Sequence, residues 1–312
     1  MKKFISSLFA CALSFVMLTF IACAPATSDT TYEGNYNEVD AQTLYNATRG
    51  VNTTFNIEPE EGKKVGAEFS LYGEYKTETN EYTSIEKESI VGQMTVESVR
   101  TDSGIEKVLR VSCASTSANE TVIDGEKSSI STTEFLYCNN EGYYVRVLQN
   151  SSMDGKTNKY DLKYKITYSE FMEKFSDVMD KLEADTSTPP LESDFITFIN
   201  NLKSVSGYKF SMATDENGFK IKAEADKDKY ADKVIEDEEL VGFDVTVKEM
   251  GLCFVFDNDK NIVASKTAMS IKKSSPYGIL TTVNRMDVRA YVGAISLPSD
   301  LNTYIDTTLV NP

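Results

Sequence analysis

Residues 208–224 read YKFSMATDENGFKIKAE, and this stretch decides the fold class. Apolar and polar side chains alternate on both sides of Asp215-Glu216-Asn217-Gly218, a run of turn-forming residues. Alternation with a period of two is typical of a strand with one buried and one solvated face, and Asn-Gly favours a tight turn. The stretch therefore predicts an antiparallel β-hairpin.

The same alternation recurs along most of the chain. Between Val65 and Lys76 it predicts one long strand, and further runs lie near residues 92–99, 108–113, 131–138, 143–148, 160–166, 241–256, 263–271 and 279–295. Residues 39–49 fit a short helix that ends at Gly50. Strands do not alternate regularly with helices, so we expect an antiparallel sheet rather than a parallel one.

Two segments in the middle of the chain show a helical period. Residues 168–184 and 193–203, on either side of Pro189-Pro190, place apolar side chains on one face of a 3.6-residue repeat. Because strands with one polar face need cover on the other, these helices are expected to pack on the sheet. The expected fold is therefore α+β and mostly β, with a large curved antiparallel sheet, half-barrel-like, packed against two central helices.

The first 23 residues form an export signal. Lys2 and Lys3 precede an apolar run from Phe4 to Phe20, which closes on Ile21-Ala22-Cys23. The segment resembles a bacterial lipoprotein signal, which implies that residues 1–22 are removed and that Cys23 carries a diacylglyceryl (palmitate-type) anchor. Ordinary secretion, with cleavage after Ala26, is the alternative.

The remainder divides into a tether and a domain. Residues 23–38 are small and polar and are expected to be a flexible tether, while residues 39–312 are expected to form a single β-rich domain. With its anchor on Cys23, this domain resembles the bacterial carriers of the LolA, LolB and LppX kind. That resemblance implies an open half-barrel, closed by helices, which binds lipid or acyl chains.

Composition excludes several functions. The net charge of −16 argues against nucleic acid as a partner, because phosphate binding needs a basic surface. The absence of histidine excludes Ser-His and Cys-His catalysis and the usual zinc enzymes. We therefore expect no enzymatic activity, no cofactor and no metal. Cys113, Cys138 and Cys253 are expected to be buried thiols, with a Cys113–Cys138 pair as the alternative.

Two acidic stretches have the composition of cation sites. Asp257, Asp259 and Asn261 have the spacing of a calcium loop, but Ile262 and Ala268 replace the glycine and glutamate that such a loop needs. A polar hairpin turn is the favoured interpretation. The run at residues 236–239 is interpreted as a solvated acidic loop.

The sequence predicts a binding protein more readily than a catalyst. We expect an exported, lipid-anchored protein on the outer face of the cell membrane or on a periplasm-facing membrane. Its function would be non-enzymatic binding of an apolar or lipid ligand; the alternative is a surface protein-interaction or structural module with no small-molecule ligand. If a cavity exists, its expected lining is Phe171, Phe175, Met179, Phe195, Phe198 and Ile199.

Overall fold

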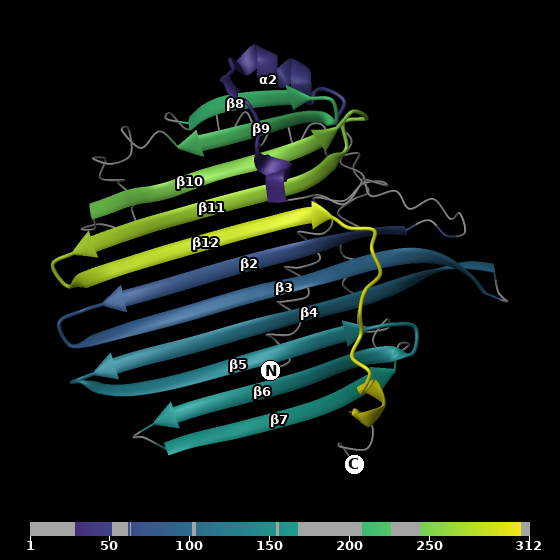
Figure 1. The fold of residues 1–312 in the computed structure, drawn as a ribbon. Helices are drawn as coiled ribbons and strands as arrows, with labels where there is room; N and C mark the ends of the chain where they lie inside the picture. The colour runs from purple at the N-terminus through teal and green to yellow at the C-terminus, as the bar shows by residue number, and fades with distance from the viewer. Residues whose placement is uncertain are drawn as a thin grey trace, which may run out of the picture.

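One broad β-sheet dominates the chain (Figure 1). The computed structural model describes residues 29–51, 62, 64–101, 104–153, 156–167, 208–225 and 244–306. The first elements are a 3-10 helix η1 (Asp29–Tyr32), strand β1 (Asn37–Glu38) and helix α2 (Ala41–Thr48). Asp40 caps α2 by accepting a hydrogen bond from the Thr43 amide. The helix predicted within residues 39–49 is therefore confirmed.

Within the described residues, the sheet has thirteen strands in the order β1-β8-β9-β10-β11-β12-β2-β3-β4-β5-β6-β7-β13. Beyond β1 they are β2 (Lys64–Glu78), β3 (Tyr82–Thr101), β4 (Gly104–Ile123), β5 (Glu126–Cys138), β6 (Gly142–Met153), β7 (Lys156–Thr167), β8 (Tyr208–Asp215), β9 (Gly218–Ala225), β10 (Asp244–Asp257), β11 (Ile262–Ser275), β12 (Gly278–Ala290) and β13 (Ile305–Asp306). A second 3-10 helix, η2 (Leu301–Thr303), precedes β13. Neighbouring strands are antiparallel, except that β13 runs parallel to β7.

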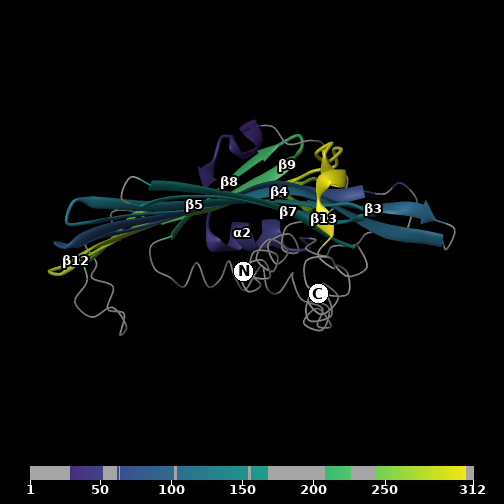
Figure 2. The same cartoon turned by 90° about the horizontal axis from the view of Figure 1, so that it is seen from below.

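The expected α+β fold with a half-barrel sheet and two central helices is wrong. The described residues are mostly β and form a single large sheet, and α2 is their one α-helix. The segments expected to be the central helices, 168–184 and 193–203, lie outside the described residues. Seen edge-on, the sheet is an open, twisted layer (Figure 2). Lateral pairing of many long strands satisfies the backbone hydrogen bonds without closure into a barrel.

The two faces of the sheet differ in character. On the apolar face, a row of directly opposed buried residues crosses five strands: Ala67, Met94, Val111, Cys138 and Tyr143. The register places a second buried cluster, around Ile221 and Phe256, on the same face, where Leu44 of α2 packs. The opposite side carries the alternate residues and is called the polar face below.

Short segments from both ends of the described chain lie on the polar face. η1 lies against β10 to β12, and the segment 291–306 crosses from β12 toward β7 (Figure 1). Figure 2 shows α2 on the other side of the sheet from both segments. β12 pairs with β2 along the full length of the strand, which joins the β2–β7 and β8–β12 halves into one sheet.

Candidate functional site

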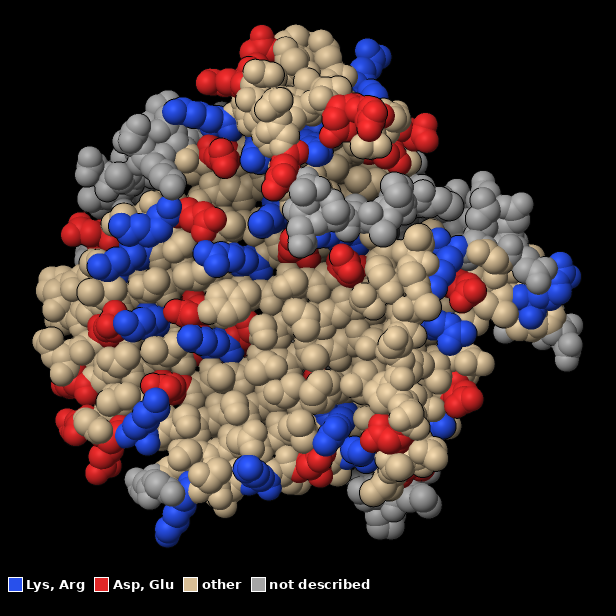
Figure 3. Space-filling view, in the orientation of Figure 1, with Lys and Arg blue, Asp and Glu red and all other residues tan. Residues whose placement is uncertain are grey.

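An open groove of about 570 Å3 crosses the middle of the polar face. Two adjacent rows of directly opposed residues, running across β12, β2, β3, β4 and β5, line it. One row is Asp287, Ser70, Val91, Ala114 and Phe135; the other is Arg289, Glu68, Gln93, Ser112 and Tyr137. Four strand spacings make each row about 19 Å long. Figure 3 shows few charges over these central strands, while Lys, Arg, Asp and Glu gather around them.

Side-chain size accounts for the hollow. Three of the six middle positions of the rows are small, Ser70, Ala114 and Ser112, while large side chains stand at both ends. Val91 is half exposed in the floor of the groove. The floor is therefore partly apolar and accessible, and the ends are polar or aromatic.

A hydrogen-bonded network closes the β12 end of the groove. The Tyr32 hydroxyl donates to Asp287 Oδ1 at 2.7 Å, and Arg289 donates to the two carboxylate oxygens through Nε at 3.0 Å and Nη2 at 2.8 Å. The Tyr32 ring also lies 5.4 Å from the Arg289 guanidinium. Side chains from two segments distant in sequence, η1 and β12, thus hold one another in place.

The same network determines the charges at this end. Burial, followed by the hydrogen bond to Asp287, raises the pKa of Tyr32 well above its ordinary range, so the phenol stays neutral. The hydrogen bonds to Asp287 raise the pKa of Arg289, which stays cationic. Both partners therefore keep their protons near neutral pH, and their hydrogen bonds to Asp287 persist there.

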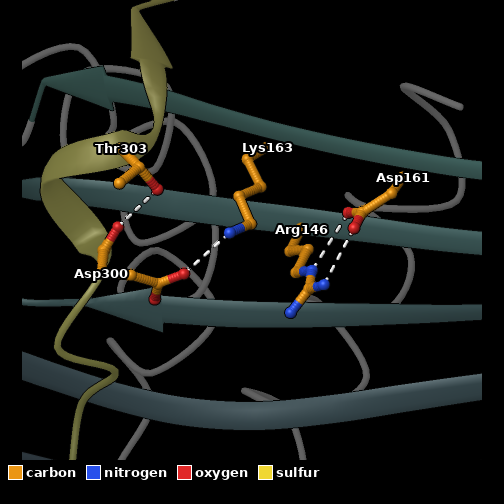
Figure 4. Close-up of polar contacts among 5 residues, drawn as sticks. All are labelled: Arg146, Asp161, Lys163, Asp300 and Thr303. Atoms are coloured by element: carbon orange, nitrogen blue, oxygen red, sulfur yellow. Dashed lines mark hydrogen bonds and ion pairs between the residues drawn. The ribbon is translucent and has the colours of Figure 1, made fainter.

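The segment 291–306 bounds the other end of the groove. The Tyr304 ring packs edge-on against the Tyr144 ring, and the centroids of these two rings are 5.7 Å apart. Tyr144 is directly opposite Tyr137, a residue that lines the groove. Lys163 Nζ lies 2.7 Å from Asp300 Oδ2 and holds the segment over β7 (Figure 4). That hydrogen bond lowers the pKa of Asp300.

A second ion pair lies beside this segment. Arg146 donates two hydrogen bonds to Asp161, at 3.0 and 2.9 Å (Figure 4), and they lower the pKa of the Asp161 carboxyl. Around the less charged groove, the polar face therefore carries both basic and acidic side chains.

Several predicted site residues fall outside the described ranges. They are Cys23, the acidic run 236–239 and the expected cavity lining Phe171, Phe175, Met179, Phe195, Phe198 and Ile199. Of the residues singled out from the sequence, the groove lining includes Cys113 alone among the described residues. The alternation within each strand could have shown which groove residues share a face, but it does not say that β12 lies beside β2.

The remaining predicted features are turns and buried thiols. Asp257 Oδ1 accepts hydrogen bonds from the amides of Asp259 and Asn261, which confirms the hairpin turn between β10 and β11. Cys113, Cys138 and Cys253 are buried and free of disulfides. Burial raises the pKa of Cys113 and Cys138 to about 12, so these thiols are protonated at neutral pH.

In comparisons with known proteins, no family model, curated protein or solved structure matches this chain. Within the described ranges, three or more potential metal-binding Cys, Asp or Glu side chains do not come together. No helix among the described residues combines the length and apolar character needed to cross a bilayer.

Proposed function

We propose that this protein is exported, anchored to a membrane through a lipid on Cys23, and binds its ligand non-enzymatically in the groove of the polar face. The observation that carries the proposal is the preformed groove, about 570 Å3 in volume, with each end held by a tyrosine. A site built before the ligand arrives loses less entropy on binding than one that must be assembled.

The lining favours a ligand with an apolar part and a polar part. Val91, Ala114 and Phe135 form an apolar strip that removes a ligand's hydrocarbon from water. Gln93 of the neighbouring row supplies a hydrogen-bond donor and an acceptor that orient a polar group. An amphipathic lipid or fatty acid combines these two properties, which is the ligand class expected from the sequence.

A charge placed in the groove floor tests this site. We expect wild-type protein to bind a fluorescent fatty acid, and Val91→Lys to weaken that binding, because the lysine places a hydrated cation in the apolar strip. Ile123→Lys is the matched control, since Ile123 is a comparably exposed aliphatic residue outside the groove. Equal weakening by both variants contradicts the groove as the site. Binding that neither variant changes would direct attention to the expected cavity lining around Phe171 and Phe195.

The anchor has its own test. Two acyl chains suffice for stable membrane attachment, because each buried methylene contributes about 0.8 kcal/mol. Radioactive palmitate should label the wild-type protein in growing cells and should not label Cys23→Ala. Equal labelling of both proteins would contradict the anchor.

A second candidate function is protein interaction at the outer edge of β7. Residues 156–161 of this strand are exposed, and the described strand β13 pairs with β7 only at Tyr164 and Lys165. An exposed strand edge can accept a further strand from a partner. A photo-crosslinking residue at Tyr160 should then give one defined adduct in cells, whereas one at the more exposed Tyr277, in a turn, should not. Identical adduct patterns at both positions would contradict this function.

A further inference from the structure

We propose that the polar face of the sheet, with its groove, is held against the lipid headgroups of the membrane that carries the anchor. This inference rests on the proposed lipid on Cys23. It goes beyond attachment, because it states which surface of the domain meets the bilayer and therefore where the groove opens. The partner is the lipid surface itself.

The spacer between the anchor and η1 is short. Of the expected tether 23–38, residues 29–32 form η1 and residues 37–38 form β1, and both contact the sheet. Only residues 24–28 then separate the anchor from η1. An extended chain spans at most 3.3–3.6 Å per residue, so Asp29 stays within about 20 Å of Cys23.

Hydrogen bonds and ring contacts fix η1 to the polar side of the sheet. The Tyr32 hydroxyl lies 3.0 Å from the Ser265 carbonyl oxygen and donates to Asp287, a residue of the polar face. The ring lies 5.6 Å from Lys266 Nζ. Farther along, the Tyr36 hydroxyl donates to the Tyr32 carbonyl at 2.9 Å, and Lys222 Nζ lies 3.9 Å above the Tyr36 ring. These contacts fix η1, into which the spacer leads, on the polar face.

The path from η1 to the opposite face is longer than the spacer. The nearest border of the sheet is the end of β11: Ser265, beneath Tyr32, lies three residues after Ile262, where β11 begins, which is about 10 Å along the strand. The edge at β1 is farther, three strand spacings or about 14 Å from β10. The chain would then have to cross the thickness of the sheet and pass α2, a further layer about 10 Å across, which packs on the apolar face. This path exceeds the reach of the spacer. The apolar face therefore cannot lie on the bilayer that holds the anchor while η1 keeps its contacts.

The position of the groove gives this orientation a consequence for function. Tyr32 closes the β12 end of the groove and is also the last of the four residues of η1, so the groove begins within four residues of the end of the spacer. Lys266 and Arg289 lie beside the Tyr32 ring, and basic and acidic side chains together border this part of the polar face (Figure 3). A ligand in the groove is then a lipid or another component presented at the bilayer surface.

Two adjacent residues of β11 provide a matched test. Ala268 and Met269 point to the polar and apolar faces respectively, and both are partly exposed. Each is replaced by cysteine in the full-length precursor, and the acylated protein is labelled with a thiol-reactive fluorophore. The native thiols Cys113, Cys138 and Cys253 are buried and stay unlabelled. The protein is reconstituted in phosphatidylcholine–phosphatidylglycerol vesicles that carry a nickel-chelating headgroup as a quencher.

We expect several-fold stronger quenching of the label at position 268 than at position 269. A flexible Gly/Ser insertion of about 20 residues after Ala24 adds about 25 Å of mean reach and should bring the two signals toward equality. Equal quenching with the native spacer, or stronger quenching at position 269, overturns the orientation. Flotation of the protein with the vesicles is measured in parallel. Protein that fails to float contradicts the anchor and the orientation together, whereas floating protein with equal quenching contradicts the orientation alone.

Discussion

Replacing Tyr32 with phenylalanine tests the network that closes the groove and holds η1. The change removes a hydroxyl that donates to a carboxylate at 2.7 Å in a largely buried site. A hydrogen bond to a charged group contributes about 1.5–3 kcal/mol to stability. Asp287 keeps both hydrogen bonds from Arg289 in the variant, so we expect the free energy of unfolding to decrease by an amount near the lower end of this range, about 1–2 kcal/mol.

Urea unfolding of wild type and variant measures this loss. Tyr45→Phe is the matched control, because Tyr45 is exposed on α2, and its variant should stay within about 0.5 kcal/mol of wild type. The pKa of Tyr32 is raised in the fold, so its contribution is complete below pH 10.0 and declines at higher pH. The difference between wild type and Tyr32→Phe should therefore be constant from neutral pH to pH 9 and should narrow above pH 10.0. Equal stability of the two phenylalanine variants at neutral pH would refute the network as a source of stability.

Three further predictions follow from burial and backbone geometry. Burial raises the pKa of Cys113 from 9.0 to about 12, so the stability of the fold should decrease between these pH values. The midpoint of urea unfolding, measured against pH, should show this decrease in wild type and a smaller one in Cys113→Ala. Gly218→Ala should lower the free energy of urea unfolding by about 3 kcal/mol or more, because φ is +144° and the new Cβ would lie 2.0 Å from the Phe256 carbonyl oxygen. Gly125→Ala is the comparison: φ is +83° and the space around it is open, so the loss should be only about 1 kcal/mol. Tyr304→Ala should speed cleavage of the segment 291–306 in limited proteolysis and leave the sheet intact, because it removes the ring packed on β6; unchanged cleavage would show that the ring does not hold the segment.

The local elements followed well from the residues. The stretch 208–224 forms the β8–β9 hairpin, and the alternation that starts at Val65 forms β2. Asp40 and Gly50 mark the ends of the short helix, and Asp257 organises a turn. Each of these features depends on dihedral preferences and hydrogen bonds within a few residues, so the sequence is sufficient to predict them.

The expected tether shows where local composition misleads. Small polar residues surround Tyr32, which favours a flexible segment. The acceptor of the Tyr32 hydroxyl, Asp287, stands 255 residues later in the chain. No property of the neighbouring residues indicates such a partner, because the contact exists only once β12 has taken its place in the sheet.

The sequence by itself determined that this protein is rich in antiparallel strands with one apolar and one polar side, and it placed their turns. Only the tertiary structure decided that β12 pairs with β2, that the sheet is an open layer, and that Tyr32 and Tyr304 bound a groove across five strands. The physical reason is that a period of two is a property of one strand's backbone. Strand order depends on which strands, far apart in the chain, bury the most apolar surface when they pair. Any amphipathic strand could pair with several others, so its own sequence does not select its neighbour.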